Sequence, residues 1–235
     1  MLPLKKTGIL LVILTLLTLV AAVPETPASA QEGERPFSFP FAGPPGPSNW
    51  LMGQPYGSTT FAYRQRLGDY RMGQGLHFGI DISARCGTPV LAIYDGVVAG
   101  IDNIYKYGAA PHNIIINHPN GYASMYGHLL ERPRLPIGTP VKRGQQIGLS
   151  GDPDETCYSR PHLHLEIGDQ THTIAYNPLN LIDMDFDTIA LSSGGGGRGF
   201  QRNLDDPRQW QNPYDQPDTL FGGPVLNSFA RPWPP

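Results

Sequence analysis

Residues 161–167, with the sequence PHLHLEI, alternate between polar and apolar side chains from His162 onward. An alternation with a period of two is typical of a β-strand that buries one of its faces. It predicts that His162, His164 and Glu166 lie on one face and that the three aliphatic residues lie on the other. Two imidazoles on one strand face can reach a common point, and burying them is costly unless each finds a partner. The alternative is a polar surface strand whose histidines have no chemical role.

The rest of the chain also favours strands over helices. Glycine and proline make up 28 and 25 of the 235 residues, which argues against a helical bundle. No segment between residues 76 and 168 has the pattern of a helix of ten residues. Short β-branched or aliphatic runs predict strands at 59–64, 88–94, 96–104, 113–117, 122–129 and after Gly144. We therefore predict an all-β, antiparallel domain.

Two turn signals punctuate these predicted strands. Asn120-Gly121 is suited to a turn with positive φ. The sequence Gly-Thr-Pro-Val occurs twice, at residues 87–90 and 138–141, and each copy reads as a turn that leads into a strand. The repeat indicates either an internal duplication or shared turn chemistry.

The N-terminal segment has the features of an export signal. Lys5 and Lys6 precede an apolar run over residues 8–23, and Ala28-Ser29-Ala30 has the form of a cleavage site. Because the run is short for a membrane span, we expect cleavage after Ala30 and only transient membrane contact. An uncleaved N-terminal anchor is the alternative. The net charge of −3, without a dense basic run, excludes nucleic acid as a favoured partner.

Composition divides the chain into four predicted regions. Residues 1–30 are the signal segment, and the Pro- and Gly-rich residues 31–48 read as an extended lead-in. Residues 49–186 form the predicted domain. Residues 187–235 have too few regularly spaced apolar residues for a core, so we expect a disordered tail.

Two further sequence elements carry groups that bind metals or move protons. His77 and Asp81 are four residues apart, and on a straight strand their side chains would lie roughly 13 Å apart. Joint metal binding therefore needs a bend, for which Gly79 is a suitable place. His128 follows Tyr126-Gly127 on another predicted strand. Hydrolytic zinc sites typically use three nitrogen or oxygen ligands and keep one position for water.

Taken in order, these elements resemble the lysostaphin/LytM-type zinc endopeptidases of family M23. The resemblance rests on His77-x-x-x-Asp81, on Tyr-Gly-His-Leu around His128, and on His162-x-His164. It extends over about residues 60–182. Further similar segments are Gly-Leu-His-Phe-Gly-Ile-Asp-Ile at 75–82, Gly-Thr-Pro-Val at 87–90, Asn-Gly-Tyr at 120–122, Val-Lys-Arg-Gly-Gln at 141–145 and Asn-Pro at 177–178.

The resemblance implies a role for each of these residues. His77, Asp81 and His164 bind one zinc ion per chain, and His128 and His162 flank the reacting water and the scissile carbonyl as catalytic residues. It also implies an antiparallel β domain with an open groove across a sheet and a duplicated motif. Glu166 shares the predicted face of His164, where it either orients an imidazole or forms a surface salt bridge.

The implied function is a secreted or cell-envelope zinc endopeptidase, acting as a monomer on the peptide crosslinks of bacterial peptidoglycan. Two alternatives stay open: a non-catalytic module that binds cell wall or activates a hydrolase, and an endopeptidase acting on secreted proteins. The loop over residues 151–160 is acidic where the family is usually rich in Gly, Ser and Thr, so substrate preference is open. His112, His118 and His172 match no family role, and we expect them at surface or turn positions.

Cys86 and Cys157 are the only cysteines of a chain that we expect to be exported. Each lies five residues from a proposed site residue, Cys86 after Asp81 and Cys157 before His162. We predict that they form a disulfide between two edges of the metal site. Two free thiols, or a thiolate ligand, are the alternatives.

Overall fold

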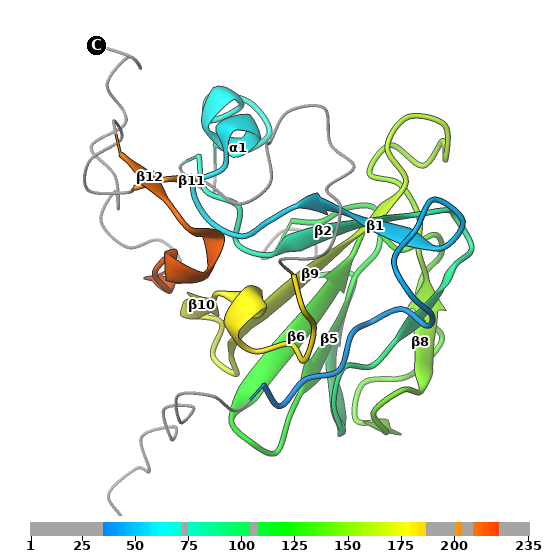
Figure 1. Ribbon diagram of the computed structural model, residues 1–235. Coiled ribbons are helices and arrows are strands. Elements are labelled where there is room, and N and C mark those ends of the chain that lie inside the picture. Colours follow the sequence, from blue (N-terminus) through cyan, green and yellow to red (C-terminus); the bar gives the residue numbers. More distant parts are fainter. Residues whose placement is uncertain (1–34, 72–74, 104–107, 187–200, 204–208, 221–235) are drawn as a thin grey trace, which may run out of the picture.

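The computed structural model describes residues 35–71, 75–103, 108–186, 201–203 and 209–220 (Figure 1). Over these residues the chain is built almost entirely from antiparallel strands, which confirms the predicted all-β class. Seven strands lie side by side in the main sheet. Their order is β1 (Trp50–Gln54), β2 (Ile80–Ala84), β9 (His162–Asp169), β6 (Tyr122–Gly127), β5 (Ile114–Asn117), β4 (Gly96–Ile101) and β7 (Pro140–Val141).

Shorter strands complete the architecture. In the main sheet, β10 (Ile174–Tyr176) pairs with β9, and β13 (Thr219–Leu220) pairs with β10. Two-stranded sheets are formed by β3 (Pro89–Leu91) with β8 (Gln146–Leu149), and by β11 (Gln201–Arg202) with β12 (Trp210–Gln211). The helical segments described are α1 (Thr60–Arg64), η1 (Pro178–Asn180) and η2 (Pro213–Asp215). None of the described helices is long and apolar enough to cross a membrane.

Strand β9 lies between β2 and β6 in the main sheet and has the two faces predicted from its alternation. Leu163, Leu165 and Ile167 are completely buried in the hydrophobic core. His164 lies on the other face, opposite Asp81 of β2 and opposite Gly127 of β6. The pairing of β2, β9 and β6 therefore places Asp81 and His164 side by side. His128 comes directly after Gly127, the residue of β6 that lies next to His164.

Both predicted turn signals are confirmed. Gly121 has a φ of +88° and donates its N–H to the carbonyl of His118. In the repeated Gly-Thr-Pro-Val segments, Thr88 and Thr139 each donate their N–H to the carbonyl three residues earlier, at 3.0 and 3.1 Å. One copy leads into β3 and the other into β7. The two copies therefore share their turn chemistry.

The prediction of a strand at residues 59–64 is wrong. This segment forms the short helix α1. The side chain of Thr59 accepts the N–H of Ala62 at 3.0 Å and so caps the helix. Ala62 and Tyr63 are buried on its inner side. A single helical turn that is held by one cap and by tertiary packing leaves little periodicity in the sequence.

The described part of the predicted lead-in belongs to the folded domain. Phe37, Phe39 and Phe41 are buried, and the rings of Phe39 and Trp50 lie 4.1 Å apart. Phe37 donates its N–H to the carbonyl of Leu181 at 3.1 Å. The aromatic residues between the prolines thus bury enough apolar surface to hold the segment in place. The predicted signal segment lies outside the described residues.

Part of the predicted disordered tail is also ordered on the domain. We call residues 209–220 the C-terminal strap; in Figure 1 it is the orange segment beside β10. Gln216 and Thr219 of the strap are 2% and 1% exposed. A polar sequence was expected to stay in solvent, but here its polar groups find hydrogen-bond partners on the domain. The rest of the tail, except residues 201–203, lies outside the described residues.

Candidate metal centre

The first proposed ligand, His77, reaches the others because the chain bends before β2. The bend falls at Gly79, as predicted, and β2 begins at the next residue. A Cβ atom on Gly79 would lie only 2.4 Å from the carbonyl oxygen of Leu165. The close passage of this backbone against β9 therefore requires glycine. It brings the side chains of His77 and Asp81 together despite their spacing.

Three ligand atoms converge at one point on the sheet. His77 Nε2 lies 3.1 Å from Asp81 Oδ1 and 3.1 Å from His164 Nδ1. His164 Nδ1 lies 2.9 Å from Asp81 Oδ1. His77 is 2% exposed, and the side chains of Asp81 and His164 are 13% and 12% exposed. Two imidazoles and a carboxylate thus meet in a largely buried place with limited access to solvent.

The opposite nitrogen of each of these imidazoles is also engaged. His77 Nδ1 lies 2.8 Å from the carbonyl of Pro55, which can only accept, so Nδ1 carries the hydrogen and Nε2 faces the cluster. His164 Nε2 lies 2.9 Å from Glu166 Oε1, so that side donates and Nδ1 faces the cluster. A hydrogen bond of this kind fixes the tautomer and orientation of a metal-binding histidine. Glu166 therefore contacts His164 and does not form a surface salt bridge.

The electrostatics of the cluster call for a positive charge. Burial raises the pKa of Asp81, but His77, His162 and the hydrogen bonds from His164 and His77 outweigh it and hold that pKa well below its usual value. Burial lowers the pKa of His164, but its hydrogen bonds to Asp81 and Glu166 raise the pKa to about 10. Two carboxylates around one imidazole thus favour a cation at this point.

This donor set fits a zinc ion. Zinc is bound by histidine nitrogen and carboxylate oxygen at about 2.0–2.2 Å, which in a tetrahedron separates the ligand atoms by about 3.3 Å. The observed separations of 2.9–3.1 Å are within a few tenths of an ångström of that value. Three protein donors also leave one tetrahedral position for water or substrate. His77, Asp81 and His164 are the only such group of three found among the described residues.

Two more imidazoles lie beside the cluster. The ring centroids of His128 and His162 are 4.7 Å apart, and those of His128 and His164 are 5.9 Å apart. His162 Nδ1 donates to the carbonyl of Arg160 at 2.6 Å, and His128 Nδ1 donates to the carbonyl of Ala110. In both rings Nε2 is therefore the unprotonated nitrogen of the neutral form. Burial, followed by the proximity of His162 and His164, lowers the pKa of His128 to about 3.

Sequence reasoning did not find the backbone groups that orient these rings. The carbonyls of Pro55 and Ala110 lie 22 and 18 residues from the histidines that they hold, whereas that of Arg160 lies two residues before His162. Every residue has a carbonyl group, so residue type carries no signal for such a role. Tyr70 was missed as well: its ring centroid lies 5.9 Å from that of His77, and its hydroxyl donates to Gln54 Oε1 at 3.1 Å.

The predicted disulfide between Cys86 and Cys157 is confirmed. Cys86 follows β2, and Cys157 lies in the acidic loop that ends at Arg160, whose carbonyl holds His162. Within this loop, Asp152 Oδ2 accepts the N–H of Arg160 at 3.1 Å. The described protein has no free cysteine, so neither a free thiol nor a thiolate ligand is present.

The remaining histidines lie apart from the cluster. His112 pairs with Asp102 at 3.0 Å and its side chain is 31% exposed, and His172 is half-buried at a turn in which its N–H donates to the carbonyl of Asp169, as predicted. His118, predicted at a surface or turn position, begins the turn in which its carbonyl accepts the N–H of Gly121, but its side chain is buried and the residue is 1% exposed. Its Nδ1 donates to the carbonyl of Asp95 and its Nε2 accepts from Ser124 Oγ at 2.8 Å, so both nitrogens are satisfied inside the core.

Comparisons with known proteins point to one family. The profile of peptidase family M23 matches residues 75–178. The chain is 40% identical over 91 residues to the peptidoglycan DD-endopeptidase ShyA of Vibrio cholerae. The aligned residues make up 39% of this chain and 20% of that protein. It is 35% identical over 119 residues to lysostaphin of Staphylococcus simulans, covering 48% of this chain and 23% of that protein.

An uncharacterized metalloprotease of Haemophilus influenzae is 35% identical over 105 residues, covering 45% of this chain and 21% of that protein. The match to these relatives thus spans only about a fifth to a quarter of their length. The solved catalytic domain of lysostaphin from S. simulans has a TM-score of 0.44 at 28% identity, covering 55% of this chain and 90% of that domain. Residues 75–178 therefore match the model of peptidase family M23, and over this region the chain is similar to these relatives.

Proposed function

We propose that this protein is a secreted, zinc-dependent endopeptidase that hydrolyses peptide crosslinks of bacterial peptidoglycan. The observation that carries the proposal is the convergence of His77 Nε2, Asp81 Oδ1 and His164 Nδ1 within 3.1 Å of one another. We propose these three as the ligands of one zinc ion per chain. Among the relatives, ShyA is named a peptidoglycan DD-endopeptidase, which supports the substrate class.

The bound zinc would act as a Lewis acid that polarises the scissile carbonyl and lowers the pKa of water. We propose that the chain's own part in the reaction falls to His128 and His162. Their Nδ1–H groups are held by the carbonyls of Ala110 and Arg160, so each Nε2 is free to exchange a proton at the site. General acid–base catalysis by a positioned histidine contributes about 100- to 10,000-fold to a rate.

One imidazole would carry a proton from the attacking water to the leaving amine. One imidazole accepts a proton at Nε2 as the water oxygen bonds to the carbonyl carbon. The same proton then passes to the amide nitrogen as the C–N bond breaks, so that the products are a carboxyl group and a free amine. The other imidazole would stabilise the negative oxygen of the tetrahedral intermediate in its protonated form, in which Nε2 carries a hydrogen to donate.

An extracytoplasmic location fits this substrate. The disulfide between Cys86 and Cys157 is of a kind that persists in oxidising compartments. Residues 1–30, with a basic start, an apolar run and a cleavage motif, are the proposed export signal.

Purified sacculi provide the test. The protein should release new amino groups from them, a chelator should abolish the release, and added zinc should restore it. Zinc binding with sacculi left intact would favour the non-catalytic wall-binding module. Cleavage of unfolded secreted proteins with intact sacculi would favour the protein-directed endopeptidase. Mass spectrometry of defined wall fragments then identifies the bond that is cut.

A further inference from the structure

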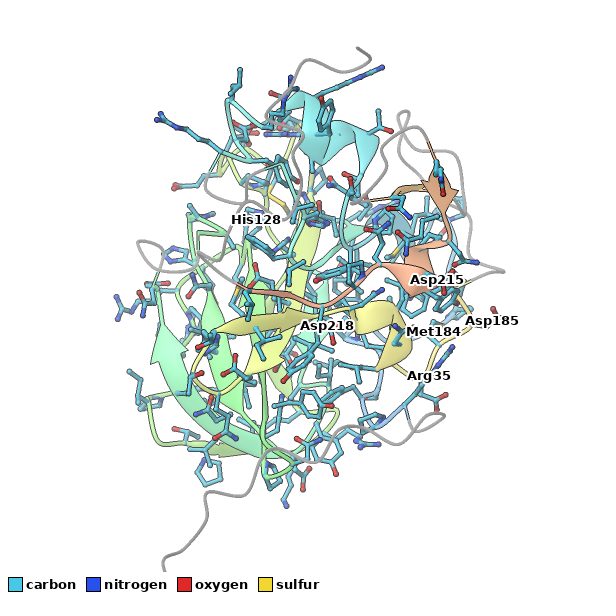
Figure 2. All side chains as sticks on the ribbon, turned by 90° about the vertical axis from the view of Figure 1, so that its left-hand side faces the viewer. Arg35, His128, Met184, Asp185, Asp215 and Asp218 are labelled. Atoms are coloured by element: carbon cyan, nitrogen blue, oxygen red, sulfur yellow. A yellow bond between two sulfur atoms is a disulfide. The ribbon has the colours of Figure 1, made fainter. Side chains whose placement is uncertain are left out.

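The C-terminal strap contacts the loop that holds His77, although it lies outside the region matched to family M23. The family match ends at residue 178, and the strap begins at 209. Strand β13 of the strap extends the main sheet, with Ile174 opposite Leu220 and Ala175 opposite Thr219. Figure 2 labels Asp215 and Asp218 on this segment where it runs along β10. The strap is therefore part of the domain in three dimensions.

Asn177, directly after β10, anchors the strap to the domain. Its Nδ2 donates to the carbonyls of Pro213 and Gln216 at 2.8 and 3.2 Å. Its backbone N–H donates to Asp218 Oδ1 at 2.9 Å. Asn177 is 1% exposed, so these hydrogen bonds are shielded from water. A single buried residue thus holds the strap at three points, two through its side-chain amide and one through its backbone N–H.

The strap in turn contacts the loop over residues 55–59. The hydroxyl of Tyr56, which is completely buried, lies 3.1 Å from the carbonyl of Pro217 and 2.9 Å from Thr219 Oγ1. Gln216 Oε1 accepts the backbone N–H of Ser58 at 3.2 Å. At Gly57, whose φ is +94°, a Cβ atom would lie 2.7 Å from the same Gln216 oxygen. The loop and the strap are therefore packed without space between them.

The other side of this loop holds His77. The carbonyl of Pro55 accepts the Nδ1–H of His77 at 2.8 Å. Gly57 and His77 also exchange two backbone hydrogen bonds, of 2.8 and 3.0 Å. The loop thus fixes both the ring and the backbone of His77. A displacement of the loop would move Nε2 away from Asp81 and His164.

We propose that the C-terminal strap, acting through Tyr56 and Gln216, is a positioning element for the zinc ligand His77. The inference rests on the proposed zinc site. A segment outside the family match would then set how tightly this chain binds its metal. Because ligand orientation by outer partners commonly changes metal affinity 10- to 100-fold, we expect an effect of about 10-fold from this more remote contact.

Two shape-conserving substitutions in the full chain test the inference. Tyr56→Phe removes the hydroxyl that contacts the strap and, at 3.0 Å, the carbonyl of Ala175 in β10. Gln216→Met removes the acceptor for Ser58 while keeping the length of the side chain, and it changes the strap alone. Each variant should bind zinc about 10-fold more weakly than the wild type, measured by competition with a chromogenic chelator. The thermal unfolding midpoint is measured on the same preparations without metal.

Asn180→Ala is the matched control. It removes the hydrogen bond from Asn180 Nδ2 to the carbonyl of Tyr214, at 2.9 Å, and so loosens the strap where it does not contact the loop over residues 55–59. It should lower the unfolding midpoint without weakening zinc binding. Tyr56→Phe decides the question if Gln216→Met does not fold.

The possible outcomes separate this inference from the proposed function. Wild-type zinc affinity in folded Tyr56→Phe and Gln216→Met, with only a lower unfolding midpoint, would show that the strap is merely structural. Equal weakening in Asn180→Ala would also overturn a specific path through the loop. A wild-type protein that binds no zinc would instead refute the proposed function.

Discussion

The two faces of β6 and β9 each carry a buried histidine network, and the two networks differ in the partners they offer. Ser124 and Tyr126 pair with Ile167 and Leu165, so they lie on the core face, where Ser124 meets His118. Gly127 pairs with His164 on the opposite face. The core face of this sheet therefore holds His118, which is buried among neutral groups, and the opposite face holds the cluster around His164.

Charge distinguishes the two networks. On the core face, neutral groups satisfy His118: the carbonyl of Asp95 and the hydroxyl of Ser124, which also lies 3.1 Å from the hydroxyl of Tyr126. On the site face, His164 lies between two carboxylates, those of Asp81 and Glu166. Burial lowers the pKa of His118, whereas the hydrogen bonds of His164 to two carboxylates outweigh burial and raise its pKa. The partners, and not burial, decide which histidine can share a cation.

The largest effect should come from removing a carboxylate on the site face. Asp81→Ala should lose the bound zinc and more than about 1,000-fold of amine release from sacculi, because the metal supplies several kcal/mol of catalysis. Metal analysis and the sacculus assay measure both quantities. The matched control on the other face, Ser124→Ala, should keep its zinc. If Asp81→Ala contains as much zinc as the wild type, the carboxylate of Asp81 is not needed to bind the metal on the site face.

The next effect separates ligands from proton-transfer groups within the site face. His128→Ala and His162→Ala should each slow amine release by about 100- to 10,000-fold while retaining one zinc ion per chain. His112→Ala, which alters a partly exposed histidine paired with Asp102, serves as the control and should remain active. Loss of zinc in either of the first two variants would add that residue to the ligand set.

The core face should respond to pH through stability. Burial lowers the pKa of His118 from 6.5 to about 4. Between these values the unfolded chain binds a proton that the folded chain does not, so stability falls as the pH falls and the loss is complete below about pH 4. The shift corresponds to about 3 kcal/mol.

Thermal unfolding of the metal-free protein between pH 7 and pH 4 measures this contribution. The wild type should lose stability over the window more steeply than His118→Gln, which has no imidazole to protonate. Parallel pH profiles for the two proteins would mean that His118 is not the group responsible.

The smallest effect concerns the partner of His164. Glu166→Ala should weaken zinc binding by about 10- to 100-fold, because His164 loses the hydrogen bond that orients it. Glu166→Gln retains an oxygen that can accept from Nε2 and should recover part of the affinity. Chelator competition measures both variants. Equal affinity in Glu166→Ala and the wild type would show that His164 is held by its backbone alone.

How much could be predicted from the sequence depended on whether the information was local. The two faces of β9 follow from a period of two, and the bend at Gly79 follows from a spacing that a straight strand cannot satisfy. The strand predicted at residues 59–64 failed because one side-chain cap, that of Thr59, together with the burial of Ala62 decides the helix. The burial of His118 was not predicted because the carbonyl that accepts its Nδ1–H belongs to Asp95, 23 residues away in the chain.

The sequence by itself determined the strand class, the residue types of the site and the order in which they occur, since periodicity and side-chain chemistry are properties of short segments. Only the tertiary structure decided that the carbonyls of Pro55 and Ala110 orient the imidazoles of His77 and His128. It alone placed the polar strap against the loop that holds His77. The physical reason is that backbone groups are the same at every residue, so their roles depend on which distant segments the fold brings within hydrogen-bonding distance.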